Sequence, residues 1–187
     1  MNVIKLGGSL LDDASRRAEV LGAIAKRWKS GEQIVLVHGG GKHVDANLKR
    51  LGIAKRTHAG LRITDDATLD VVVSTLAGSV NKMLVSELAA MGVRAAGFSG
   101  CDASTLIAEL HEPIEGVALG HVGRVTGGDP ALINAVIGAG IMPILSSVAE
   151  GPNGSLLNVN ADTAAAAIAI AVGAEKLVFI TDVAGLL

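Results

Sequence analysis

The chain has 187 residues, half of them hydrophobic, and only 2% of them aromatic. Sixteen basic against 18 acidic side chains, with so few stacking rings, argue against a nucleic-acid partner. The single cysteine, Cys101, excludes an internal disulfide framework, and the most apolar stretch, residues 164–174, is too short to cross a bilayer. We therefore expect a soluble cytoplasmic protein with no membrane partner.

Strand and helix patterns alternate in the first third of the chain. Residues 2–6 read as a buried strand that ends at a Gly-Gly turn, and helical spacing runs from Asp13 to a stop at Gly31. A second strand over 33–37 is followed by three glycines and a short helix over 44–51. The polar segment 55–63 predicts a hairpin.

The same alternation continues to the end. A long helix is predicted from a cap at Thr64 or Asp65 to about residue 91, then a strand over 94–98 and short strands or a hairpin over 104–126. Asp129-Pro130 predicts the start of a helix that runs to residue 139, and strands are predicted over 141–145 and 156–159. Asp162 is predicted to cap a helix that ends at residue 173, and a last strand covers 177–180. This order predicts a three-layer αβα sandwich around a mostly parallel open sheet.

The last residues, 181–187, read as a loop that leaves a strand with no helix to follow. Ligand loops of α/β proteins start at this end of a strand. We therefore expect the chain to be incomplete, and to stop within a nucleotide-binding part.

Two glycine turns follow predicted strands, Gly7-Gly8 and Gly39-Gly40-Gly41. Glycine lets backbone N–H groups approach a phosphate closely, although any tight strand-to-helix turn also favours it. Neither turn matches Gly-x-Gly-x-x-Gly or Gly-x4-Gly-Lys-Ser/Thr, which disfavours a Rossmann dehydrogenase and a Walker-type NTPase.

Charged and amide side chains near these turns suggest a site for anions. Lys5 lies in a strand that should be buried, so its ammonium either reaches a phosphate or is solvated on an edge strand. Arg62 could hold a carboxylate through its two-pronged guanidinium. Asn158, Asn160 and Asp162 can face one site if they alternate along a strand; alternatively, Asp162 only caps the following helix. The histidines show no metal-ligand spacing, so we expect no metal ligands from the protein.

Taken together, these motifs resemble the amino acid kinase family. The resemblance covers the whole chain, and within the family it is strongest to members that phosphorylate N-acetyl-L-glutamate. It rests on Lys5-Leu6-Gly7-Gly8-Ser9, Val37-His38-Gly39-Gly40-Gly41, Gly60-Leu61-Arg62-Ile63-Thr64, Leu119-Gly120-His121-Val122-Gly123, Leu157-Asn158-Val159-Asn160-Ala161-Asp162 and Phe179-Ile180-Thr181-Asp182-Val183-Ala184-Gly185.

The resemblance implies a carbamate kinase-like fold and transfer of a phosphoryl group from ATP to the side-chain carboxylate of N-acetyl-L-glutamate, a step of arginine biosynthesis. Mg²⁺ would be held through the phosphates. Residues 1–160 would bind the acceptor and form a homodimer, and residues 161–187 would begin the nucleotide-binding domain. The helix over 65–91 would contribute to the dimer interface, because Val71, Val72, Val73, Leu76 and Val80 give it more apolar surface than one sheet face needs.

The resemblance also implies roles for individual residues, in three groups. The catalytic pair would be Lys5 and Asp162; the substrate would contact Gly40, Gly41, Arg62, Asn158 and Asn160; and the nucleotide would contact Gly7, Gly8, Thr181, Asp182 and Gly185. Three alternatives stay open: a kinase for carrier-protein-linked aminoadipate or glutamate, an acceptor-binding fragment without turnover, and a non-kinase α/β module.

Overall fold

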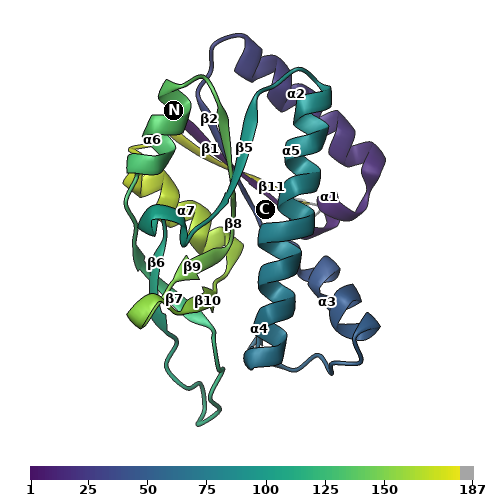
Figure 1. The fold of residues 1–187 in the computed structure, drawn as a ribbon, viewed down its shortest axis with the longest axis vertical. Coiled ribbons are helices and arrows are strands. Elements are labelled where there is room, and N and C mark those ends of the chain that lie inside the picture. The colour runs from purple at the N-terminus through teal and green to yellow at the C-terminus, as the bar shows by residue number, and fades with distance from the viewer. Residues whose placement is uncertain (182–187) are drawn as a thin grey trace, which may run out of the picture.

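The computed structural model describes residues 1–181 and is built around a five-stranded parallel sheet in the order β11-β1-β2-β8-β5 (Figure 1). All its strand pairs are parallel. The strands are β1 (Asn2–Leu6), β2 (Ile34–His38), β5 (Ala95–Ser99), β8 (Met142–Ser146) and β11 (Lys176–Ile180). Each lies within one residue of its predicted range, because a strand buried on both faces reads as a short, nearly continuous apolar run.

Helices cover both faces of this sheet, which confirms the three-layer αβα fold. Figure 1 shows α2 and α5 on one side and α6 and α7 on the other. Alternate residues of the strands pack against the two layers: Ile4 and Leu36 face α2 and α5, while Val3 and Val37 face α6 and α7. The helices are α1 (Gly8–Asp12), α2 (Ala14–Lys29), α3 (Gly41–Arg50), α4 (Asp66–Val73), α5 (Asn81–Ala90), α6 (Ala131–Gly138) and α7 (Ala161–Ala171).

A second sheet stands beside the main one and was not predicted as such. Its order is β10-β9-β6-β7, with β6 (Ile107–Leu110), β7 (Gly123–Gly127), β9 (Val148–Glu150) and β10 (Leu156–Asn158). The short strands expected over 104–126 are therefore β6 and β7, which pair antiparallel across the long loop 111–122. The strand predicted at 156–159 is β10 of this sheet. β9 was not predicted, because three residues are too few to show a strand pattern. The hairpin predicted at 55–63 is β3 (Thr57–His58) with β4 (Leu61–Arg62).

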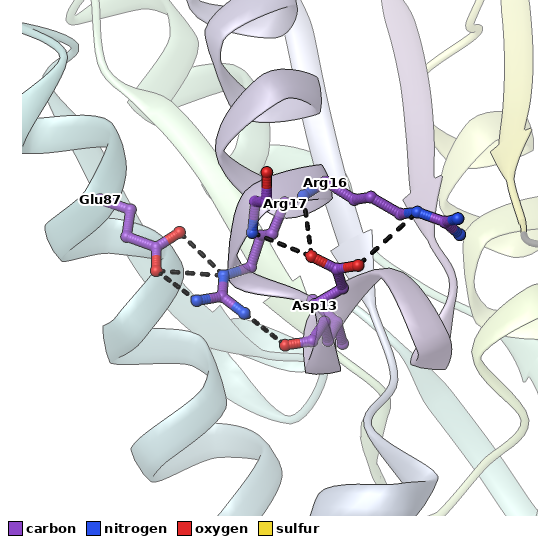
Figure 2. A network of polar contacts seen from close by, with 6 residues as sticks. Asp13, Arg16, Arg17 and Glu87 are labelled. Atoms are coloured by element: carbon purple, nitrogen blue, oxygen red, sulfur yellow. Dashed lines mark hydrogen bonds and ion pairs between the residues drawn. The ribbon is translucent and has the colours of Figure 1, made fainter.

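A partly buried ion pair joins α2 to α5 on one face of the sheet (Figure 2). Arg17 is almost fully buried; its guanidinium donates to both carboxylate oxygens of Glu87, at 2.8–3.0 Å, and also to the carbonyl of Leu11 at the end of α1. Asp13, where the helical spacing was predicted to begin, caps α2, because its carboxylate accepts from the backbone N–H groups of Ser15 and Arg16. The contact of Arg17 with Leu11 and the cap at Asp13 together place α1 against α2.

The long helix predicted from residue 65 is continuous but contains a π-helical turn. Asp65 caps α4, the π-helical segment η1 covers Ser74–Val80, and α5 follows directly. Asp66–Ala90 is long and apolar enough to cross a bilayer by length and composition alone, yet nearly half of its most apolar window is buried inside the protein, as in the core helix of a globular domain.

The apolar surface of this helix is used within the chain. Val71, Val72, Leu76 and Val80 are each at most 4% exposed. Three of them pack with α3, and Val80 belongs to the core beneath the sheet. α3 and the sheet core therefore cover these four residues, and a contribution of the helix to a dimer interface stays a prediction.

The cap of α7 also differs from the prediction. Asn160, not Asp162, is the N-cap: its side-chain oxygen accepts from the backbone N–H groups of Asp162 and Thr163, at 2.8 and 3.2 Å. Asp162 lies in the first turn of the helix. Asparagine and aspartate cap helices equally well, so residue type alone could not separate them. As a result, the Asp162 carboxylate remains available for a different contact.

Candidate functional site

A cavity of about 260 Å³ opens at the carboxyl ends of β1 and β2, beside the start of α7. It brings together eight of the twelve residues that the sequence singled out. They are Lys5, Gly8, Gly40, Gly41, Arg62, Asn158, Asn160 and Asp162. Its position agrees with the rule that ligands of open α/β sheets bind beyond the carboxyl ends of the strands.

Lys5 and Asp162 form an ion pair in this cavity, with 2.8 Å between Nζ and Oδ1. β1 lies between β11 and β2, so the alternative of a solvated edge-strand lysine is wrong. The Lys5 side chain is only 14% exposed, whereas that of Asp162 is 56% exposed. Asp162 thus holds the ammonium from the solvent side, and Lys5 lines the cavity together with residues of both glycine turns.

The three polar residues of the 158–162 segment meet at the cavity by a strand-to-helix junction. Asn158 ends β10, Asn160 caps α7, and Asp162 lies in the first turn of α7. They face one site as predicted, but regular alternation along a strand is not the reason. The amide nitrogen of Asn158 donates to Thr64 Oγ1 at 3.2 Å, and Thr64 in turn donates to the carbonyl of Arg62 at 2.8 Å.

The first glycine turn leads directly into a short helix, α1, that was not predicted. Gly7 donates its N–H to the carbonyl of Ile180 at 2.8 Å, and a Cβ on Gly7 would lie 2.7 Å from that same oxygen. Gly7 is therefore absent from the cavity lining, and close approach of β11 explains why it is glycine. Gly8 lines the cavity, and its α-carbon faces open space.

The second glycine turn follows β2 and starts α3. Gly40 caps this helix with φ +151°, a backbone conformation that side chains strongly disfavour. A Cβ at Gly40 would also lie 2.9 Å from Leu76 Cδ2 in the π-helical segment. Gly41 has open space above its α-carbon, so its backbone is accessible to a ligand.

Arg62 reaches the cavity from the β3–β4 hairpin and is held in place by α3. Its Nη2 donates to the carboxylate of Asp45 and, at 3.2 Å, to the carbonyl of Gly41. Its Nη1 is buried and has no partner in the described part of the chain. Burial raises the pKa of Asp45, but hydrogen bonds from Lys55 and Arg62 outweigh burial and bring the pKa below its usual value. Arg62 therefore has a fixed anion on one side and a free donor on the other.

The remaining predicted residues lie elsewhere. Thr181 lines a neighbouring cavity with Leu10 and Arg16, while Asp182 and Gly185 lie outside the described residues. Sequence reasoning missed Ser147, Val72, Leu76 and Asp45. Ser147 follows the carboxyl end of β8, a position that could have marked it.

The polar groups of the cavity suit a phosphorylated or carboxylated ligand more than a metal ion. Within residues 1–181, no three His, Cys, Asp or Glu side chains gather into a group that could hold a metal. Lys5 and Arg62 supply cationic donors, and the glycines supply accessible backbone.

Comparisons with known proteins agree with this geometry. The family profile described as the Amino acid kinase family matches residues 1–187. The chain is 44% identical over 190 residues to an acetylglutamate kinase of Methanopyrus kandleri, covering all of this chain and 73% of that protein.

Solved structures give the same result for the fold. A Streptococcus mutans protein, smu.665, superposes with a TM-score of 0.87 at 30% identity, covering all of this chain and 74% of that one. Carbamate kinase of Giardia superposes with a TM-score of 0.67 at 15% identity, covering 98% of this chain and 72% of that one, a likeness of fold alone. The order of the glycine turns, the Lys5–Asp162 pair and these matches lead to one conclusion: the chain belongs to the amino acid kinase family.

Proposed function

We propose that this protein transfers the γ-phosphoryl group of ATP to the side-chain carboxylate of N-acetyl-L-glutamate, as an acetylglutamate kinase of arginine biosynthesis. The observation that carries the proposal is the Lys5–Asp162 ion pair, at 2.8 Å, in the cavity that also holds Gly8, Gly40 and Arg62. Similarity to the Methanopyrus kandleri protein of that name supports the choice of acceptor.

The chemistry needs charge neutralisation and positioning more than proton transfer. A glutamate-type carboxylate, with a pKa of about 4.3, is already ionised at neutral pH and needs no general base. Its oxygen attacks the γ-phosphorus, the bond to the β,γ-bridging oxygen breaks, and ADP leaves with the electron pair. Lys5, held by Asp162, neutralises charge on the transferring group, and backbone N–H groups of Gly8 and Gly41 assist it.

The acceptor would be held on the opposite side of the cavity. Arg62 Nη1, buried and without a partner in the described residues, is suited to the α-carboxylate. Asn158, whose amide nitrogen is tied to Thr64, would present its oxygen to the acetamido N–H. Gly40 and Gly41 would line the pocket, and Asn160 would support Asp162 through its cap.

The proposal includes Mg²⁺ and a nucleotide partner. When bound, the metal would neutralise charge on the phosphates and be held through them, since the described residues offer no cluster of their own. Thr181, Asp182 and Gly185 would begin the nucleotide contacts. Residues 161–187 would start a nucleotide-binding part, after an acceptor-binding and dimer-forming part over residues 1–160, in a cytoplasmic enzyme.

The homodimer rests on the family resemblance. Light scattering at micromolar concentration should give twice the chain mass, and a monomer would count against the dimer.

A hydroxamate assay with MgATP tests the reaction, because hydroxylamine traps acyl phosphates. We expect product with N-acetyl-L-glutamate and little with free glutamate or aminoadipate. Preference for an aminoadipate or glutamate presented on a carrier protein would favour the alternative kinase. Calorimetric titration with N-acetyl-L-glutamate is the second arm: saturable binding without turnover would identify an acceptor-binding fragment, and no binding at all would contradict the proposal.

A further inference from the structure

His38 ends β2 directly before the second glycine turn, and it is fully buried between β1 and β8. An imidazole in such a place needs partners for both ring nitrogens, since an unpaired polar group is costly in the interior. Its Nδ1 lies 2.8 Å from the carbonyl oxygen of Gly39. Its Nε2 lies 3.1 Å from the amide nitrogen of Asn81.

These two contacts determine where the imidazole proton lies. A carbonyl oxygen only accepts, so Nδ1 must carry the hydrogen. The Asn81 amide nitrogen also lies 3.0 Å from the carbonyl of Ile144, which fixes the amide with its NH₂ group toward His38. Nε2 must then accept, and His38 is neutral. Burial also lowers the pKa of His38 to about 4, in agreement with this state.

Asn81 is positioned by two features of the fold. It is fully buried and is the first residue of α5, directly after the π-helical segment. Its side chain lies against Gly97 of β5, where a Cβ would overlap the Asn81 carboxamide. The π-helical segment also packs Leu76 and Val80 against Gly40. One irregular turn therefore supplies both the polar and the apolar support of the glycine turn.

We infer that His38 and Asn81 are positioning residues, which orient the Gly39–Gly40 peptide for ligand binding. In a trans peptide the C=O and the following N–H point in opposite directions. With the Gly39 carbonyl held by His38 in the interior, the Gly40 N–H points away from His38, to the side of the cavity. Gly39 and Gly40 line that cavity, and His38 does not. The inference deepens the proposed function, because it assumes that a ligand binds there.

Nuclear magnetic resonance of the unsubstituted chain tests the arrangement without any ligand. A long-range ¹H–¹⁵N spectrum should show His38 neutral, with the proton on Nδ1. Asn81→Asp replaces a donor by an acceptor, so Nε2 should gain a proton, and the amide signals of Gly39, Gly40 and Gly41 should shift and exchange faster. Asn134→Asp, on the exposed side of α6, is the matched control and should change neither.

Binding of N-acetyl-L-glutamate, followed by calorimetry, tests the consequence. His38→Ala should raise the dissociation constant about tenfold, since misplaced donors weaken a preorganised site. His38→Asn keeps a donor near the position of Nδ1 and should restore most of the affinity. Gly97→Ala leaves His38 and Asn81 chemically intact, but its Cβ displaces the Asn81 amide. It should therefore weaken the binding of N-acetyl-L-glutamate as His38→Ala does.

Three results would overturn the inference: a proton on Nε2 in the unsubstituted chain, unchanged glycine amides in Asn81→Asp, or equal affinity of the His38→Ala variant and the parent. Should the parent fail to bind N-acetyl-L-glutamate while the imidazole and glycine signals behave as expected, the proposed acceptor is wrong and the positioning stands. The spectrum of the unsubstituted chain needs neither a ligand nor a variant, so it decides the position of the imidazole proton even if a variant folds poorly.

Discussion

The two glycine turns follow neighbouring parallel strands and look alike in the sequence, yet different parts of the protein hold them. At the first turn the backbone of β11 approaches Gly7, whose N–H donates to the carbonyl of Ile180. At the second turn, side chains from distant segments provide the support: His38 from β2, Asn81 from α5 and Leu76 from the π-helical segment. Glycine is thus required for close backbone approach in one turn and for an unusual φ in the other.

Because their supports differ, the two turns should tolerate different substitutions and different changes of pH. The first depends on the pairing of β1 with β11, and its ligand-facing charge comes from Lys5, on β1 itself. The second depends on a titratable ring and an amide that never touch the cavity. Substitutions and pH should therefore affect the two turns differently.

The largest expected effect is on catalysis at the first turn. Lys5→Ala should lower kcat for acyl phosphate formation on the order of 10²–10³-fold, because the ammonium neutralises charge that develops during transfer. The hydroxamate assay measures this, with Lys176→Ala, an exposed lysine on β11, as control. An unchanged kcat, or an effect on KM alone, would remove Lys5 from the catalytic role.

Acid should weaken the second turn first. The pKa of His38 falls from 6.5 to about 4 on folding, mainly by burial. Between these values the unfolded chain binds a proton at His38 and the folded chain does not, so stability falls as pH falls through this window. The loss should reach about 3 kcal/mol near pH 4. Urea denaturation between pH 7 and 4 measures it.

The matched variant for this titration is His38→Asn, which has no group that titrates in the window. Its stability should vary much less between pH 6.5 and 4.5. A parent chain whose unfolding free energy is flat over the same range would show that His38 is not buried as a neutral ring.

The sequence predicts the main sheet well because its physical signal is local. β1, β2, β5, β8 and β11 are short apolar runs with glycine or polar residues after them, and each was located within one residue. The second sheet was not foreseen, since β9 is three residues long and is held by pairing with β10 and β6. Nor does any local pattern reveal the π-helical turn at Ser74–Val80, whose Leu76 and Val80 pack against Gly40.

The site shows the same division between local and distant causes. The motifs and their order were enough to predict that Lys5, Arg62 and Asp162 share one site, and the three residues line one cavity. The cap at Asn160 and the contact between Arg62 and Asp45 depend on geometry that residue types do not specify. The nucleotide contact of Gly7 stays a prediction; its N–H donates to the carbonyl of Ile180, a contact with the end of β11 that the local sequence does not reveal.

A pair of alanine substitutions separates the two roles of glycine within the first turn. Gly7→Ala would bring a Cβ to 2.7 Å from the Ile180 carbonyl oxygen, and its nearest neighbours are backbone atoms of Ile180 and Thr181, which have little room to adjust. It should lower the free energy of unfolding by about 1–3 kcal/mol. Gly8→Ala meets nothing within 4 Å, so it should leave stability nearly unchanged and weaken nucleotide binding. Urea denaturation and a nucleotide titration measure the two effects, and equal stability loss in both variants would contradict the distinction.

The smallest effect is expected at Arg62, which contacts the second turn through the carbonyl of Gly41. Arg62→Ala should raise the dissociation constant for N-acetyl-L-glutamate about tenfold, because one charge-assisted contact to the α-carboxylate is lost. The fold should persist, since Asp45 keeps its 2.7 Å ion pair with Lys55. Nucleotide affinity should stay nearly constant, as Lys5 and Gly8 are untouched. Arg124→Ala, an exposed arginine paired with Glu109 in the second sheet, is the control. A loss of nucleotide affinity with unchanged acceptor affinity would mean that the acceptor lies on the other side of the cavity.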